Sequence, residues 1–117
     1  MELKQIYEQM QGDYYSVLER LSTEERVKKY LLKFMDKNMD RLILDALEEK
    51  DYERAFREAH NLKGVCANLN MDKLEQSASA LTEELRGGAP KGDITAYVQA
   101  LQSDYDMTLC ALKHLDE

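Results

Sequence analysis

Apolar side chains recur about every 3.6 residues along almost the whole chain, which is the repeat of an α-helix with one buried face. A half-buried strand would instead alternate apolar and polar residues, and no long stretch does so convincingly. The sequence contains a single proline, so little interrupts these helical patterns. We therefore predict an all-α protein.

The length of the chain sets the number of domains. A chain of 117 residues forms one compact domain that buries roughly two thirds of its unfolded surface. Its content of 44% hydrophobic and 33% charged residues is typical of a globular protein rather than a disordered one. We predict a single domain over residues 1–117. Residues 1–21 form short helices, 2–10 and 14–21, that brace a helical bundle over residues 22–117.

The charge of the chain limits its partners. It has 16 basic and 23 acidic side chains, a formal net charge of −7. This sign is wrong for binding nucleic acid or an anionic membrane, so we exclude both as partners. Apolar runs are short, as at residues 42–44, and residues 1–10 lack the apolar centre of a signal peptide. We expect a cytoplasmic protein without a transmembrane helix.

Four long helices follow the brace, each beginning near a residue that caps helix N-termini. They cover residues 23–49, 52–69 and 72–86, and a last stretch that ends near residue 115. The predicted caps, with that of helix 14–21, are Asp13, Ser22 with Glu25, Asp51, Asp72 with Glu75, and Asp93. The segment GGAPKG, residues 87–92, is predicted to be a loop. Short connections make neighbouring helices antiparallel, so we predict an up-down-up-down four-helix bundle.

Two asparagines have predicted roles in these helices. The apolar stripe of residues 23–49 keeps helical phase without a break, so we predict one continuous helix there. Asn38 is the only polar residue on this stripe, and it is expected to bend the helix or to bond across the core. Asn70 follows the next helix, where its tolerance of positive φ suits a left-handed C-terminal residue.

The second long helix carries residues that packing does not require. With about 100° per residue and the core face centred on Ala59, His60 lies at the border between buried and exposed positions. Gly64 follows one turn later, although glycine inside a helix costs about 0.5–1 kcal/mol relative to alanine. With Ala67 a further turn on, it leaves room for another protein beside the imidazole. Lys63 supplies a cation that can neutralise a negative group on His60.

Each of these residues also has an ordinary explanation. A histidine at a helix edge is usually incidental, and a surface lysine is usually only solvated. A glycine inside a helix can allow two helices to cross closely. Their combination within one turn favours a functional site.

The stretch AHNLKGVCANLNMDKLEQ, residues 59–76, resembles the histidine phosphotransfer (HPt) domain family of multistep two-component phosphorelays. The hallmark of that family is HxLKG on the second long helix of a four-helix bundle. His60, Leu62, Lys63 and Gly64 match it in order. Looser similarity extends on both sides, and the resemblance covers about half of the chain.

The resemblance implies a role for each matching residue. His60 corresponds to the phosphoacceptor, Lys63 to the cation that stabilises the phosphoryl group, and Gly64 to the clearance for a docking receiver domain. Residues nearby that would contribute to docking or to orienting the histidine are Phe56, Arg57, Ala67 and Thr82.

The chain departs from the family pattern at two positions. Asn70 stands where glycine is common, a change that a left-handed turn tolerates. Thr82 stands where the family often has a Gln or Glu that holds the other imidazole nitrogen. Its shorter hydroxyl would need help, such as a water molecule, to orient His60.

The resemblance implies a phosphorelay carrier, in which His60 accepts a phosphoryl group from one receiver's aspartyl phosphate and passes it to another receiver. Histidine suits this role because its ordinary pKa of about 6.5 leaves most imidazole neutral and nucleophilic near pH 7. The sequence contains no glycine-rich nucleotide loop and no acidic cluster for magnesium. We therefore predict no enzyme and no cofactor on this chain, with the aspartate and Mg²⁺ supplied by the receiver.

No metal site is expected either. The histidines are His60 and His114, and Cys66 and Cys110 lack metal-ligand spacing and are predicted to lie in the core. The expected partners are response-regulator receiver domains, with a hybrid histidine kinase as a further partner. The protein is expected to be a monomer.

Two other interpretations stay open. In one, the protein is a non-catalytic helical adaptor and His60 is incidental. In the other, the chain is a piece of a larger hybrid histidine kinase, which keeps the chemistry and changes its context. Phosphate transfer separates the first of these from a phosphorelay carrier.

Overall fold

The computed structural model describes residues 1–116 of the chain. Within these residues the backbone forms helices and connecting turns and no strand, which confirms the predicted all-α class. The helices are α1 (Leu3–Gln9), α2 (Tyr14–Leu21), α3 (Glu24–Lys37), α4 (Met39–Glu48), α5 (Tyr52–Leu69), α6 (Asp72–Leu85), α7 (Thr95–Leu112) and the short 3-10 helix η1 (Lys113–Asp116).

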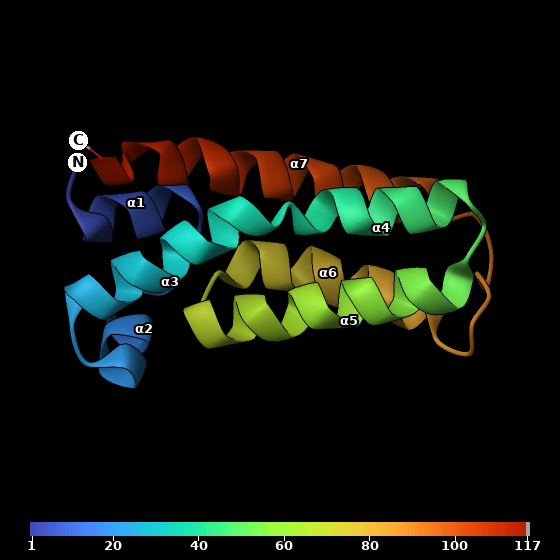
Figure 1. Ribbon diagram of the computed structural model, residues 1–117, viewed down its shortest axis with the longest axis horizontal. Coiled ribbons are helices and arrows are strands. Elements are labelled where there is room, and N and C mark those ends of the chain that lie inside the picture. Colours follow the sequence, from blue (N-terminus) through green and yellow to red (C-terminus); the bar gives the residue numbers. More distant parts are fainter. Residues whose placement is uncertain (117) are drawn as a thin grey trace.

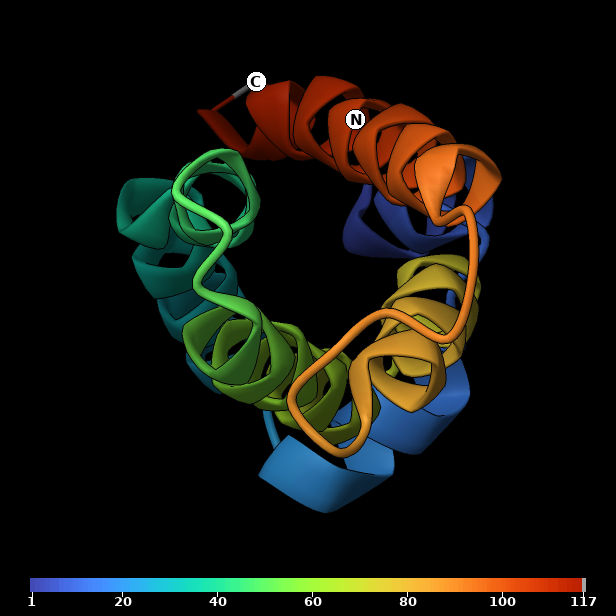
Figure 2. The same cartoon turned by 90° about the vertical axis from the view of Figure 1, so that its right-hand side faces the viewer.

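The long helices lie side by side along the longest dimension of the molecule, which is 41 Å (Figure 1). α3 and α4 follow one another along one rod, and the next rods, α5, α6 and α7, run in alternating directions. α5 packs against α4 and α6, and α7 packs against the same two helices, so the rods surround a common interior (Figure 2). Every α-helix contributes buried apolar side chains to one core.

The two N-terminal helices are fixed to the turn between α5 and α6. The buried hydroxyl of Tyr7 donates to the carbonyl oxygen of Leu69 at 2.7 Å. The amide of Asp13 donates to the carbonyl oxygen of Asn70 at 2.9 Å. A Cβ at Gly12 would lie 2.5 Å from that Asn70 oxygen, so only glycine permits this close approach. The N-terminal helices thereby hold the C-terminal end of α5 in place.

Several predicted helix ends agree with the structure. Asp13 and Asp51 cap α2 and α5, because each carboxylate accepts a hydrogen bond from the amide three residues later. Asn70 ends α5 with φ of 53°, which is the left-handed conformation predicted for it. Residues 87–92 form the predicted loop between α6 and α7.

Three predicted N-caps are shifted by one or two residues. The hydroxyl of Thr23 caps α3, whereas Ser22 ends α2 with φ of 78°. Asp72 lies in the first turn of α6, because the fully buried Met71 occupies the capping position. Asp93 precedes α7 by two residues, and its carboxylate accepts a hydrogen bond from the first amide of that helix. α7 is followed by η1, so the regular α-helix ends before residue 115.

The prediction of one continuous helix over residues 23–49 is wrong. Asn38 adopts the left-handed conformation, with φ of 49°, and separates α3 from α4. The amide of Met39 donates instead to the buried hydroxyl of Tyr105 on α7, at 3.1 Å. The side chain of Asn38 is exposed and makes no capping hydrogen bond. A hydroxyl on a distant helix therefore accepts the hydrogen bond of the Met39 amide at the break. The apolar pattern of residues 23–49 does not reveal this contact.

The two cysteines lie in different environments. Cys66 is buried as predicted, and burial raises the pKa of its thiol. Cys110 is exposed, contrary to the prediction, because it lies on the same outer side of α7 as the exposed Asp106 one turn earlier. Across residues 1–116, no group of three or more His, Cys, Asp or Glu side chains is placed to hold a metal ion. None of the helices in this part of the chain is long and apolar enough to cross a membrane.

Candidate functional site

His60 lies on the exposed face of α5, farther from the core than the border position that the sequence predicted. Its ring stacks on the ring of Phe56 one turn earlier, with centroids 6.1 Å apart and planes 15° apart. Within the described part of the chain, the imidazole makes no hydrogen bond. Its two nitrogens are therefore accessible to a molecule that approaches this face.

Phe56 connects His60 to the end of α6. The Arg86 guanidinium lies over the Phe56 ring, with Cζ 5.3 Å from the ring centroid, which is a cation–π contact. The same guanidinium donates to both carboxylate oxygens of Glu83, at 2.7 Å and 3.1 Å. Contacts therefore run from His60 through Phe56 and Arg86 to Glu83. We call these four residues, together with Lys63, the α5–α6 cluster.

The charges of this cluster influence one another. Lys63 lies one turn after His60 and is partly buried. The hydrogen bond from Arg86 is the main cause of a lowered pKa at the Glu83 carboxyl, and the positive charges of Lys91 and Lys63 also lower it. Glu83 is therefore ionised near neutral pH, and Arg86 is its ion-pair partner.

The surface on the C-terminal side of His60 is open. Gly64 is exposed, and a Cβ added there would meet no atom within 4 Å. This excludes close helix crossing as the reason for a glycine in the middle of α5. Ala67 is partly exposed one turn later, and Arg57 is exposed one turn before His60. The open surface predicted beside the imidazole is therefore present, while its use by a partner stays a prediction.

Thr82 is not placed to orient His60. It is fully buried on α6, and its hydroxyl donates to the Ala78 carbonyl oxygen of the same helix at 2.6 Å. Threonine hydroxyls commonly bond to the preceding turn in this way, which leaves nothing to donate elsewhere. The orienting role that the sequence suggested for Thr82 therefore has no support in this geometry. Phe56 is the residue that contacts the imidazole.

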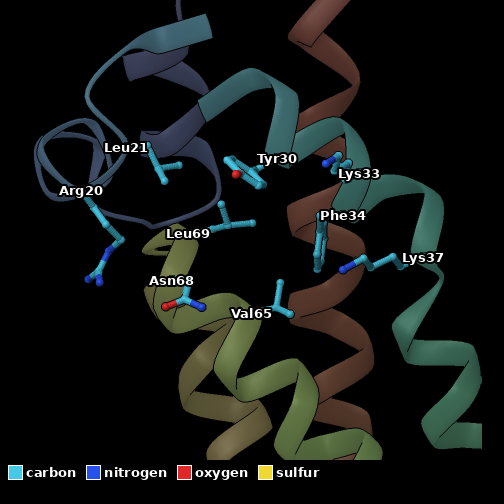
Figure 3. Close-up of a pocket in the computed structure, with 9 residues that line it drawn as sticks. All are labelled: Arg20, Leu21, Tyr30, Lys33, Phe34, Lys37, Val65, Asn68 and Leu69. Atoms are coloured by element: carbon cyan, nitrogen blue, oxygen red, sulfur yellow. The ribbon is translucent and has the colours of Figure 1, made fainter. Parts of the chain in front are cut away.

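A second feature opens on the other flank of α5. Residues of α2, α3 and α5 line a hollow, which we call the basic hollow (Figure 3). Its volume is about 470 Å³. Three of the lining residues, Arg20, Lys33 and Lys37, are cations, and none of them forms an ion pair within residues 1–116. None of the lining residues is acidic. The lining is Arg20, Leu21, Tyr30, Lys33, Phe34, Lys37, Val65, Asn68 and Leu69.

Sequence reasoning missed Glu83, Arg86 and the basic hollow. The spacing of Glu83 and Arg86 does suggest a charge pair on one helix. However, the rotation of α6 against α5 decides that this pair meets Phe56, and no local pattern encodes that rotation. The hollow likewise depends on how α2 packs against α3, because only the fold brings Arg20 beside Lys33 and Lys37.

Comparison with known families identifies a match over most of the chain. The family model of the Hpt domain matches residues 2–113, a span that contains His60, Lys63 and Gly64. Comparisons with curated proteins and with solved structures give no match. Since the family match extends over both N-terminal helices and the whole of α7, this chain belongs to the Hpt domain family.

Proposed function

We propose that His60 is the phosphoacceptor of this Hpt domain. In our proposal it takes a phosphoryl group from the aspartyl phosphate of one receiver domain and passes it to another. Hpt domains act in phosphorelay and two-component signalling, where they carry phosphoryl groups and interact with response-regulator receiver domains. The observation that carries the proposal is the exposed imidazole beside Lys63 and the open surface at Gly64.

The transfer step follows from ordinary phosphoryl chemistry. The lone pair of His60 Nε2 attacks phosphorus, the bond from phosphorus to the aspartate oxygen breaks, and the aspartate leaves as a carboxylate. The other ring nitrogen keeps its proton during the attack and releases it to water afterwards. Lys63 neutralises charge on the phosphoryl oxygens. The aspartate belongs to the receiver. The receiver would also hold the Mg²⁺, which would stabilise the charge that develops during transfer.

The fold suits this role as an antiparallel up-down-up-down four-helix bundle that presents one face of α5, with residues 1–21 as its brace. The basic hollow lies next to the surface at Gly64, because its exposed lining residue Asn68 follows Gly64 by one turn of α5. We propose that the hollow takes part in receiver docking. Its three cations form no ion pair within residues 1–116 and suit an acidic surface on the receiver. Its apolar wall suits a transient contact of modest area. The cytoplasmic location, the monomeric state and a hybrid histidine kinase as partner stay predictions.

The test is transfer from a phosphorylated receiver. We expect the wild-type protein to become phosphorylated in an acid-labile and base-stable form, and His60→Gln to remain unlabelled. His114→Gln is the matched control, because His114 is the other of the two histidines, and it should be labelled as wild type is. Label that persists in His60→Gln would contradict the assignment. A wild-type protein that no receiver labels would favour the adaptor interpretation.

A further inference from the structure

We propose that Glu83 sets how strongly His60 retains its phosphoryl group. In this proposal, which rests on the proposed function of His60, the Glu83 carboxylate holds Arg86 and offsets Lys63 while the histidine is unphosphorylated. After transfer, Arg86 leaves Glu83 and bonds to the phosphoryl oxygens. Glu83 is thus a positioning residue, since it acts through the two cations and does not touch the reacting atoms.

The contacts of Arg86 support this exchange. Its guanidinium lies over the Phe56 ring, and the Phe56 ring also stacks on His60, so one aromatic side chain separates the cation from the imidazole. The Arg86 and Glu83 side chains are 52% and 53% exposed. Ion pairs this exposed are weak, because water screens them and both side chains lose freedom. A phosphoryl group offers the guanidinium the same two-pronged geometry with more negative charge.

The charges of the cluster support it as well. Lys63 is the cation proposed to neutralise the phosphoryl group, and its positive charge already contributes to the lowered pKa of Glu83. A site selected only to retain phosphate would have no reason to pair the Arg86 guanidinium with a carboxylate. A relay must also give the phosphoryl group away, and a nearby carboxylate weakens its retention by repulsion.

The first test measures the equilibrium of phosphoryl transfer between a receiver and this protein. Glu83→Gln is expected to shift that equilibrium about three- to tenfold toward phosphorylated His60, as the loss of one partly screened charge predicts. Arg86→Gln should shift it in the opposite direction.

Glu58→Gln is the matched control. It changes the net charge of the protein by the same amount as Glu83→Gln, and Glu58, which lies on α5, forms no ion pair within the described chain. Equal equilibria for Glu83→Gln and Glu58→Gln would overturn the proposal, as would an Arg86→Gln variant that retains phosphate as well as wild type does.

The second test reads the charge at the phosphoryl group directly. His60 is phosphorylated with phosphoramidate, which needs no receiver, and the phosphorus NMR signal is followed against pH. Removing a carboxylate lowers the pKa of the phosphorylated imidazole, and removing a cation raises it. We therefore expect a lower pKa in Glu83→Gln and a higher one in Arg86→Gln than in the wild type. A Glu83 that only stabilises the fold would leave this titration unchanged.

The two proposals can fail separately. If no receiver labels the wild type, the proposed function of His60 is contradicted. If receivers label the wild type but the Glu83 and Arg86 variants behave as it does, only the role of Glu83 is contradicted.

Discussion

At the scale of single residues, His60 and Gly64 are both exposed on α5, and packing explains neither of them. The imidazole stacks on the ring of Phe56 and makes no hydrogen bond in the described chain. The glycine has nothing near the position of its missing Cβ. The helix therefore gives up some intrinsic stability at this point without a gain in packing.

Gly64→Ala is expected to stabilise the protein by about 0.5–1 kcal/mol, because alanine is the better helix residue and its methyl group meets no atom here. Urea unfolding at neutral pH measures this. Gly12→Ala is the contrasting variant and should destabilise, since its Cβ would lie 2.5 Å from the Asn70 oxygen and 2.9 Å from the Tyr7 ring. A destabilised Gly64→Ala protein would mean that the fold needs the glycine.

Gly64→Gln tests clearance rather than stability. The longer side chain has space in the isolated protein, so the helical circular dichroism should stay nearly unchanged. A receiver that docks over this position would meet the new side chain, and we expect transfer to slow by about tenfold or more, which is about 1.4 kcal/mol in the barrier. Stopped-flow or quench measurements of transfer give the rate. An unchanged rate would remove Gly64 from the docking surface.

At the scale of helices, the break between α3 and α4 depends on Tyr105. Its hydroxyl accepts the hydrogen bond of the Met39 amide, and burial raises the pKa of Tyr105 to about 12. The folded protein therefore favours the protonated phenol. This contribution to stability is complete below the ordinary tyrosine pKa of about 10 and is lost as the pH rises toward 12.

Tyr105→Phe leaves the Met39 amide without its partner, which should cost about 1–3 kcal/mol in urea unfolding at pH 7. Between pH 10 and 12 the wild type should lose more stability than the variant, because the variant lacks this ionisable group. Tyr15→Phe, at a side chain that is 65% exposed, is the control and should behave as wild type does. A variant with the same alkaline loss as wild type would contradict this account of the break.

The same break shows how far the sequence can predict the fold. Local signals predicted the helices well, because a cap such as Asp51 or a left-handed residue such as Asn70 acts on its own neighbours. The hydrogen bond from Met39 to Tyr105 joins α4 to α7, and neither local pattern contains it. Thr82 illustrates the same limit at the site, since the sequence shows a hydroxyl but does not show that its own helix already uses it.

At the scale of the whole molecule, an acidic protein presents a basic hollow next to its candidate phosphoacceptor helix. The net charge of −7 would repel an acidic receiver surface on average. Arg20, Lys33 and Lys37 reverse the sign locally, and within residues 1–116 no ion pair neutralises them. Docking should therefore depend on where the cations lie, rather than on the total charge.

The double variant Lys33→Gln, Lys37→Gln tests this. We expect transfer from a receiver to slow by about three- to tenfold at low ionic strength and to differ less from wild type at high salt, where these charges are screened. Lys28→Gln, Lys29→Gln makes the same change in net charge at exposed positions of α3 outside the hollow, and should have a small effect. Equal slowing by both pairs would assign the effect to net charge and remove the hollow from the docking surface.

We propose that His60 carries the phosphoryl group, and labelling by phosphorylated receivers from the same genome is the most direct test. Each receiver is labelled with radioactive phosphate and incubated with the wild type, His60→Gln or His114→Gln. We expect at least one receiver to transfer its label to the wild type and to His114→Gln, and none to transfer it to His60→Gln. Label on His60→Gln, or no label on the wild type from any receiver, would contradict it.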